Sequence, residues 1–408
     1  MTIDTQSLKA FFESQLPPGL EMLRQMVSIN SFTLNRDGVN RLGKLTAHCF
    51  TPLGFQPEYV PSSNPDLGNH LVLTRPGRSN KSLAMVSHLD TVFPPEEEIA
   101  NNFHWQVEGD HIFGPGTLDI KSGTVMMWLV LTALRAKAPQ LFEDVTWKLF
   151  WNSSEECLSP DFEHVVRNRL PARTTAMLVF EAENRQGPNR LMVAARKGRI
   201  TWKVTVNGRG AHAGGNLKHG ASAVTQLANL VQRIEGMTDF AKQLTFNVGR
   251  VSGGTVLNRV PHEAVAEGEF RAFSPAICDE AKAQLLGLAG KGDVRSRADG
   301  YPCEVSVEIT SESRPWPRNS ATDRLLTLWA DSGRELGTSV LAEERGGLSD
   351  GNSFWDLVPT LDGLGPWGDN DHCSERSPDG SKLPEFVEIS SFVPKAMLNT
   401  ISILKLLS

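Results

Sequence analysis

Residues 83–94, LAMVSHLDTVFP, begin as a short apolar run and continue directly into His88 and Asp90. An apolar run of this length is typical of a buried β-strand. Because side chains two positions apart in an extended chain point the same way, His88 and Asp90 should emerge on one side of the strand, with Cα atoms about 6.5 Å apart. Taken alone, the pair could equally be a solvated polar strand end, since loops are generally polar.

Other ionisable residues follow apolar, strand-like runs in the same manner. They are Glu155 and Glu156 after DVTWKLFWN (144–152), Glu181 at the end of TAMLVFE (175–181), and His372 after VPTLDG (358–363). Asp119 lies in GPGTLDIKSG (114–123), at the start of a helix-like segment that is apolar nearly all round. Strands separated by helices indicate an α/β fold with a mostly parallel sheet covered on both faces. The carboxyl ends of such strands meet at one edge, where ligands bind.

The sequence pattern changes after residues 195–198. Residues 200–206 alternate between apolar and polar side chains, which is the period of a strand with one wet face. The order that follows is strand, helix, strand, strand, helix, strand, which is typical of a small ferredoxin-like α+β sandwich. We therefore expect residues 199–312 to form a domain inserted into a larger α/β domain made of residues 1–198 and 313–408.

The composition of the chain limits the classes of protein and of partner that can be expected. A chain of 408 residues with 40% hydrophobic and 22% charged residues is long enough for two globular domains. The net charge of −6 is spread along the chain, so nucleic acid and anionic membranes are not expected partners. We expect no signal peptide, no apolar stretch that approaches a membrane span, and a cytoplasmic location. The five scattered cysteines favour neither a disulfide framework nor a thiolate zinc site.

The cluster of acids and histidines at one sheet edge predicts a metal site. Like charges confined together cannot all ionise, so several acids would hold protons unless a cation were present. Two histidines among carboxylate oxygens suit zinc or a similar divalent ion, and there are enough of them for two ions. These residues predict a two-metal hydrolase. The alternative is a set of unrelated surface acids that happen to follow strands.

In this order the motifs resemble the signature of the metallopeptidase family that contains aminoacylase, acetylornithine deacetylase and glutamate carboxypeptidase. The motifs are HLD (88–90), GPGTLDIKSG (114–123), Glu155-Glu156, VFEAEN (179–184) and GDNDHCSE (368–375). The resemblance covers essentially the whole chain, and glutamate carboxypeptidases are the most similar branch. It implies a zinc-peptidase catalytic domain with an inserted lid and dimerisation domain.

The resemblance also assigns roles to these residues. It implies two zinc ions, with Co²⁺ or Mn²⁺ as alternatives, bridged by Asp119. One ion would be held by His88 and Glu181, and the other by Glu156 and His372. Asp90 would orient His88, Glu155 would be the general base, and the peptide bond between Asp119 and Ile120 would be cis.

In the inserted domain the resemblance singles out three residues. His212 in GRGAHAG would stabilise the oxyanion in the partner subunit's site, which implies a homodimer formed through residues 199–312 and a moving lid. Asn258 and Arg271 would bind the substrate α-carboxylate. The residues themselves also allow plainer roles: His212 as a surface turn histidine, and Arg271 in a cross-strand salt bridge on the polar face that it shares with acidic neighbours.

The resemblance implies cleavage of the amide bond of a C-terminal, glutamate-like amino acid from a small peptide or N-acyl amino acid. Arg190 and Arg314 could then bind an acidic substrate side chain. The alternatives are an N-acyl amino-acid deacylase, a dipeptidase, and a catalytically silent homologue that acts in binding or assembly. Leu348, at a position where glycine is expected, and the long segment after His372 put substrate preference in doubt. GPGTLD lacks the third glycine of a dinucleotide loop, and no serine-hydrolase elbow is present.

Overall fold

The computed structural model describes residues 4–408, which form two compact units. The larger unit comprises residues up to Ala194, Arg318–Glu343 and Ser349–Ser408. The smaller unit comprises Ala195–Pro317 and Glu344–Leu348. The insertion expected at 199–312 is thus a few residues longer at each end, and a short segment from later in the chain joins it.

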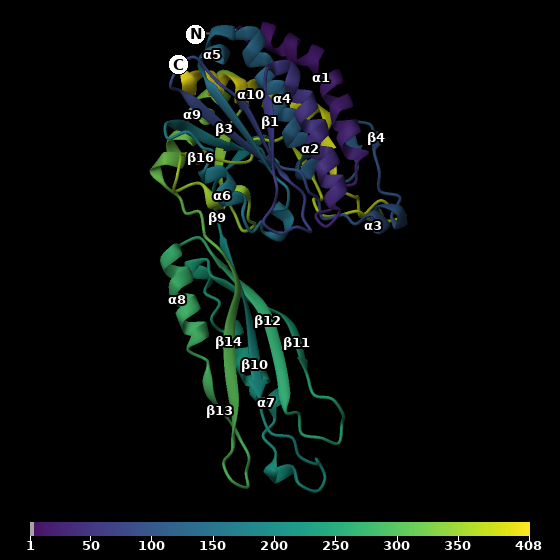
Figure 1. Ribbon diagram of the computed structural model, residues 1–408, viewed down its shortest axis with the longest axis vertical. Coiled ribbons are helices and arrows are strands. Elements are labelled where there is room, and N and C mark those ends of the chain that lie inside the picture. The colour runs from purple at the N-terminus through teal and green to yellow at the C-terminus, as the bar shows by residue number, and fades with distance from the viewer. Residues whose placement is uncertain (1–3) are drawn as a thin grey trace. The chain divides into compact units, whose positions relative to one another are not determined.

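A six-stranded sheet forms the centre of the larger unit, in the order β1-β2-β6-β3-β7-β16 (Figure 1). The strands are β1 (Gln56–Val60), β2 (His70–Arg75), β3 (Ser82–His88), β6 (Thr146–Asn152), β7 (Thr174–Val179) and β16 (Thr360–Leu361). The four strands β6, β3, β7 and β16 are mutually parallel, whereas β1 and β2 extend the sheet with antiparallel pairing. Because parallel strands end at one edge, the residues that follow β3, β6 and β7 are delivered to the same place.

Each face of this sheet packs against its own apolar cluster. Leu83 and Met85 of β3 join one cluster, while Ala84 and Val86 join another on the opposite face. Four long helices pack against the first face: α1 (Thr5–Val27), α4 (Ser122–Lys137), α9 (Ser320–Glu335) and α10 (Ile389–Leu407). α2 (Arg36–Phe50) also joins the first cluster, and α6 (Phe162–Arg167) packs on the second face. The predicted sheet with both faces covered is confirmed.

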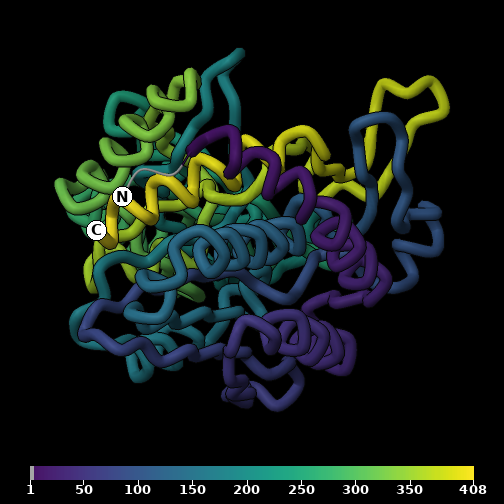
Figure 2. Tube along the Cα trace, turned by 90° about the horizontal axis from the view of Figure 1, so that it is seen from above, coloured from purple at the N-terminus to yellow at the C-terminus, as the bar shows by residue number. Residues whose placement is uncertain are grey.

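The apolar segment that precedes and includes α4 corrects the expectation that no apolar stretch approaches the length of a membrane span. Residues Thr117–Lys137 are helical, 21 residues long and apolar enough by composition to cross a membrane, and 83% of the most apolar window is buried within the protein. Figure 2 shows α4 lying beside α1 and α10. The segment is apolar on every side because it is enclosed by these helices and the sheet.

The larger unit also contains a second sheet of four short strands, in the order β17-β18-β5-β4. Its strands are β4 (Gln106–Glu108), β5 (His111–Phe113), β17 (Gly368–Asp369) and β18 (Phe386–Glu388). The remaining short elements include α3 (Pro95–Ala100), α5 (Pro139–Asp144), β8 (Asn184–Gln186), β9 (Asn189–Arg196) and β15 (Val340–Arg345). The small sheet matters because β5 leads into the segment that carries Asp119, and β17 leads into the segment that carries His372.

The smaller unit contains a five-stranded antiparallel sheet in the order β11-β12-β10-β14-β13, with helices α7 (Ala223–Glu235) and α8 (Pro275–Leu286). The strands are β10 (Gly198–Asn207), β11 (Thr245–Gly253), β12 (Glu263–Ala272), β13 (Gly290–Arg295) and β14 (Pro302–Ser313). Four of them have the expected ferredoxin-like order. The edge strand β13 was not predicted from the sequence, because its run GKGDVR has neither apolar alternation nor β-branched enrichment.

Candidate metal centre

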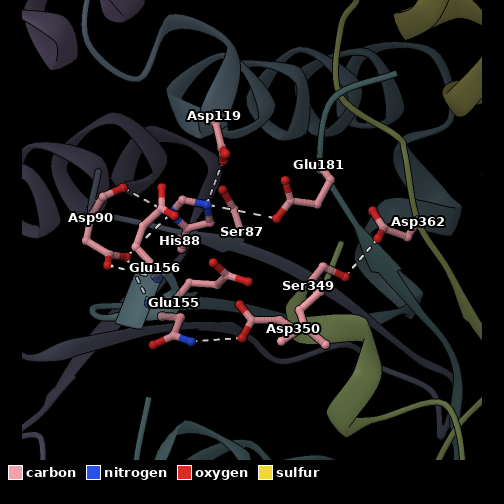
Figure 3. Close-up of polar contacts among 12 residues, drawn as sticks. Ser87, His88, Asp90, Asp119, Glu155, Glu156, Glu181, Ser349, Asp350 and Asp362 are labelled. Atoms are coloured by element: carbon pink, nitrogen blue, oxygen red, sulfur yellow. Dashed lines mark hydrogen bonds and ion pairs between the residues drawn. The ribbon is translucent and has the colours of Figure 1, made fainter. Parts of the chain in front are cut away.

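The predicted metal ligands of the larger unit converge at the carboxyl edge of the central sheet. Figure 3 shows His88, Asp119, Glu156 and Glu181 gathered there. His88 ends β3, Glu156 lies in a short turn after β6, and Glu181 follows β7. Asp119 comes from the helical turn η2 (Thr117–Lys121) that precedes α4, and His372 from the loop after β17. The peptide bond between Asp119 and Ile120 is cis, as the family resemblance implied.

The ligand atoms form two groups that share Asp119. Among residues 4–408, the donor atoms of His88, Asp119 and Glu181 lie within 4.8 Å of one another, as do those of Asp119, Glu156 and His372. Asp119 Oδ1 lies 2.9 Å from His88 Nε2, while its Oδ2 lies 3.2 Å from His372 Nε2. Each oxygen of this carboxylate therefore faces one group, which is the arrangement that a bridging ligand requires.

The donor set fits two divalent cations of the zinc type. Each group offers one imidazole nitrogen and carboxylate oxygens from two residues, a combination that zinc binds readily. Glu156 Oε2 lies 3.3 Å from His372 Nε2, and its buried Oε1 has no hydrogen-bond partner among the described residues. A buried carboxylate oxygen without a donor is costly unless a cation satisfies it.

The electrostatics of the cluster indicate the same need for positive charge. Burial, with the negative charge of Asp119, raises the pKa of Glu156 to about 7. Burial also holds the pKa of Glu155 well above its usual range. Hydrogen bonds to Asp119 and Glu156 raise the pKa of His372 to about 11. Protons thus accumulate on groups that a divalent cation would otherwise neutralise.

Asp90 has a larger structural role than the orientation of His88. The ring nitrogen His88 Nδ1 donates to the backbone oxygen of Asp90 at 3.0 Å, and this leaves Nε2 available to a metal ion. The Asp90 carboxylate lies 3.4 Å from the same nitrogen, and it accepts the backbone N–H groups of Glu155 at 3.0 Å and Glu156 at 3.2 Å. The residue therefore also holds the turn that presents Glu155.

Side chains hold the two residues before this turn as well. Ser153 N donates to His70 Nδ1 at 3.1 Å, and Ser154 N donates to Asn152 Oδ1 at 3.1 Å. The buried His70 uses its other nitrogen to contact Asp161 Oδ1 at 3.1 Å. Four successive backbone N–H groups, from Ser153 to Glu156, therefore donate to side chains. The sequence predicted none of these supports except Asp90, because His70 and Asp161 lie outside every motif.

Asp350 is a further acidic residue that sequence reasoning missed. It is buried in the turn η6 (Asp350–Ser353), and its Oδ1 accepts from Asn152 Nδ2 at 2.8 Å. In Figure 3 its carboxylate lies next to that of Glu155. Burial raises the pKa of Asp350 to about 7. The only signal in the sequence was its place in the polar run GGLSDGNS.

Comparison with known proteins identifies similar sequences. A family model described as a peptidase dimerisation domain matches residues 194–292. Carboxypeptidase G2 from Pseudomonas sp. (strain RS-16) is 24% identical over 384 residues, which cover 93% of this chain and 87% of that protein. Succinyl-diaminopimelate desuccinylase from Bordetella parapertussis is 24% identical over 363 residues, which cover 86% and 88% respectively.

Solved structures share the fold. Aminopeptidase PepT from Bacillus cereus has a TM-score of 0.75 at 19% identity, covering 96% of this chain and 99% of that chain. A dinuclear metal-binding peptidase of the M20 family from Bacillus subtilis has a TM-score of 0.67 at 12% identity, covering 97% and 99%. The chain has the fold of M20 peptidases and contains a peptidase dimerisation domain. The expectation of a metallopeptidase-type hydrolase from the ordered motifs is confirmed at that level.

In the smaller unit, His212 is exposed and fixed in one tautomer. Its Nδ1 accepts the backbone N–H groups of Gly214 at 3.1 Å and Gly215 at 3.0 Å, so the proton of the neutral ring is on Nε2. Asn258 is exposed, and its backbone oxygen accepts from Ala213 N at 2.9 Å. The turn of His212 and the loop of Asn258 are therefore joined, although what their side chains bind stays a prediction.

The arginines predicted to bind substrate differ in their surroundings. Arg271 Nε donates to Glu269 Oε1 at 2.7 Å and its Nη1 to Gly346 O at 2.8 Å, so a salt bridge forms, but within one strand rather than across strands. Arg190 is buried, with Nη1 at 2.6 Å from Glu183 Oε2. That pairing favours a structural role over the predicted contact with substrate. Arg314 is exposed just after β14, and its role stays a prediction.

Proposed function

We propose that this hydrolase is a two-metal carboxypeptidase that cleaves the amide bond of a C-terminal, glutamate-like amino acid. The observation that supports the two-metal proposal is the position of Asp119, whose two oxygens face separate groups of ligand atoms. The proposed reaction follows from the similarity to carboxypeptidase G2 along 93% of the chain.

Two divalent ions, for which zinc is the simplest choice given the ligands, would polarise the scissile carbonyl and acidify a water molecule. His88 and Glu181 would hold one ion, Glu156 and His372 the other, and Asp119 both. The buried carboxylate of Glu155 would take the proton of the attacking water and pass it to the leaving nitrogen. Burial raises the pKa of Glu155, which makes it a stronger base than an exposed carboxylate.

Side chains of the smaller unit would complete the reaction. The Nε2–H of His212 is free to donate to the oxygen that gains charge as the carbonyl is attacked. We propose that this donor acts in the partner subunit of a homodimer formed through the smaller unit, with Asn258 and Arg271 binding the substrate α-carboxylate. A model of the peptidase dimerisation domain matches most of that unit, which supports the homodimer.

A second candidate is hydrolysis of an N-acyl amino acid, as a deacylase would perform it. The similarity to succinyl-diaminopimelate desuccinylase, over 86% of the chain, favours this alternative. The two candidates use the same metal chemistry and differ in the part of the substrate that is recognised. A carboxypeptidase requires a free α-carboxylate on the leaving amino acid and tolerates a large acyl group, whereas a deacylase is selective for the acyl group.

The test combines metal analysis with a matched substrate panel. The purified chain loaded with Zn²⁺, Co²⁺ or Mn²⁺ would be given N-acyl glutamates with small and large acyl groups, N-acyl alanines, and the same compounds with the α-carboxyl group amidated. We expect two ions per chain, preference for glutamate and loss of hydrolysis on amidation. Strict selectivity for one small acyl group would favour the deacylase, and metal binding without hydrolysis of any compound would indicate a silent homologue.

A further inference from the structure

Glu385 is a buried acidic residue that is neither a predicted metal ligand nor part of the proposed mechanism. It lies immediately before β18, is 0% exposed, and uses Oε1 to accept the backbone N–H groups of Leu118 at 2.8 Å and Asp119 at 3.2 Å. The backbone of Asp119 and Ile120 is not helical, and buried backbone N–H groups outside a regular helix need an acceptor from elsewhere. Gly116, at the start of this turn, has no side chain to offer, so Glu385 supplies the acceptor from 267 residues away along the chain.

The main chain of Glu385 reaches the other ligand segment. Its N–H donates to the backbone oxygen of Cys373 at 2.7 Å, and Cys373 directly follows His372. His372 has a positive φ of 62°, a conformation that a non-glycine residue keeps only when its surroundings hold it. One residue is therefore hydrogen-bonded both to the turn that carries Asp119 and to the loop that carries His372.

The small sheet keeps Glu385 in place despite the long loop that precedes it. β18 pairs with β5 and with β17, the strands that lead toward Asp119 and His372 respectively. The packing is close, since a Cβ atom on Gly368 of β17 would lie 2.0 Å from the backbone oxygen of Phe386. Residues 374–384 can therefore form an irregular loop without moving the two contacts that Glu385 makes.

We propose that Glu385 is a positioning residue that sets Asp119 relative to His372, and so determines how tightly the group Asp119, Glu156 and His372 binds its metal ion. This inference rests on the proposed two-metal function. Residues that orient metal ligands through hydrogen bonds commonly change metal affinity by about 10- to 100-fold when they are replaced. The hydrogen bonds of Glu385 reach the segments of both Asp119 and His372, which belong to the second group, whereas the first group shares only Asp119, so the effect should be larger for the second group than for the first.

The chemistry of the side chain provides a conservative replacement. Only Oε1 accepts the two N–H groups, and Oε2 has no hydrogen-bond partner among the described residues. Glutamine keeps an oxygen that can accept both bonds, whereas alanine removes the acceptor and leaves Leu118 N and Asp119 N unpaired. Glu385→Gln should therefore behave like the wild type, and Glu385→Ala should not.

Two measurements on the full chain test the proposal. Amide hydrogen exchange of the metal-free protein should show faster exchange at Leu118 and Asp119 in Glu385→Ala than in the wild type or Glu385→Gln. Titration of the metal-free protein with Zn²⁺ against a chromophoric chelator should show that the ion of the group Asp119, Glu156 and His372 is bound about 10- to 100-fold more weakly in Glu385→Ala. The ion of the other group, which shares Asp119, should be weakened less. Asp379→Ala is the matched control, because Asp379 accepts bonds only within the exposed turn of the same loop.

Each outcome decides the matter. Unchanged exchange at the two amides, or unchanged affinity for the ion of the second group, in Glu385→Ala would overturn the proposal. Equal weakening of both ions, or the same weakening in Asp379→Ala, would show a general structural role and overturn it too. If the wild type itself bound only one ion, the proposed two-metal function would fail, and the inference with it; the wild-type titration alone identifies that case.

Discussion

The carboxylate of Glu155 allows the sharpest test at the scale of single residues. Glu155→Gln keeps the size and the burial of the side chain but removes its ability to accept a proton. We expect kcat to fall by about 10²- to 10⁴-fold, a range common for the loss of a general base. Zinc content, measured by atomic absorption, should stay at the wild-type level.

The neighbouring residue Glu156 is the matched comparison for that change. Glu156 Oε2 lies in the second ligand group, so Glu156→Gln should lose both activity and one of the two ions. Retained activity in Glu155→Gln, or equal metal loss in both variants, would contradict the separate roles proposed for these adjacent residues.

Asp90 illustrates how one carboxylate supports several groups. Asp90→Ala would leave the backbone N–H groups of Glu155 and Glu156 and the hydroxyl of Thr33 without their acceptor. Each buried donor left unpaired costs about 1–3 kcal/mol. We expect the free energy of unfolding of the metal-free protein, measured with urea, to fall by at least about 2 kcal/mol.

Thr33→Val is the control for Asp90→Ala. It removes the hydroxyl bond of 2.7 Å to Asp90 Oδ2 and a longer contact of 3.4 Å to the backbone oxygen of Thr91, and it nearly preserves the side-chain volume. Its cost should be clearly smaller than that of Asp90→Ala. Equal losses in the two variants would mean that the bonds to the Glu155–Glu156 turn contribute little to stability.

At the scale of elements, His70 connects the start of β2 to the end of β6. Burial lowers the pKa of His70 below its usual 6.5, against the opposing effect of Asp161. Below about pH 6.5 His70 is protonated in the unfolded chain but stays neutral in the folded protein. The free energy of unfolding therefore falls as the pH decreases from about 6.5 through the lower pKa that His70 has in the folded protein. His70→Gln removes this titration. Its free energy of unfolding should fall less between about pH 7 and about pH 5 than that of the wild type, as measured with urea; parallel curves would refute the assignment.

The start of α4 packs directly on the end of β7. A Cβ atom on Gly123 would lie 2.1 Å from the backbone oxygen of Phe180, the residue before Glu181. Gly123→Ala should therefore push this strand end away and lower the free energy of unfolding by about 1–3 kcal/mol, the usual cost of overpacking. Gly43→Ala in α2 is the control, because its added methyl would meet only a side-chain atom of Leu89 at 3.3 Å. A loss in Gly43→Ala as large as that in Gly123→Ala would contradict this account.

At the scale of the whole molecule, the proposed homodimer can be tested by mixing two inactive variants. If His212 of one subunit serves the site of the other, then mixed dimers of Glu155→Gln and His212→Ala contain one intact site. Random exchange in an equal mixture should restore about a quarter of wild-type activity, because half of the dimers are mixed and each has one working site of two. Activity that does not rise on mixing, although sedimentation shows subunit exchange, would place His212 in the site of its own chain or outside any site.

Much of the site could be predicted from the sequence because His88, Glu156 and Glu181 each end or follow a strand of the parallel sheet. In a parallel sheet the strand ends converge, so His88, Glu156 and Glu181 were expected together before any contact was known. The supports of the site could not be predicted in this way. His70, Asn152, Asp350 and Glu385 act through hydrogen bonds to residues that are mostly distant in the chain, and no spacing rule connects them.

The sequence by itself determined the main alternation of strands and helices, the presence of an inserted unit and the residue types at the strand ends, because hydrophobic periodicity and turn chemistry are local properties. Only the tertiary structure decided that Asp119 presents one oxygen to each histidine, that Arg190 pairs with Glu183, and that Asp90 also holds a turn. Hydrogen bonds and ion pairs depend on distances of about 3 Å, which folding sets between residues far apart in the chain.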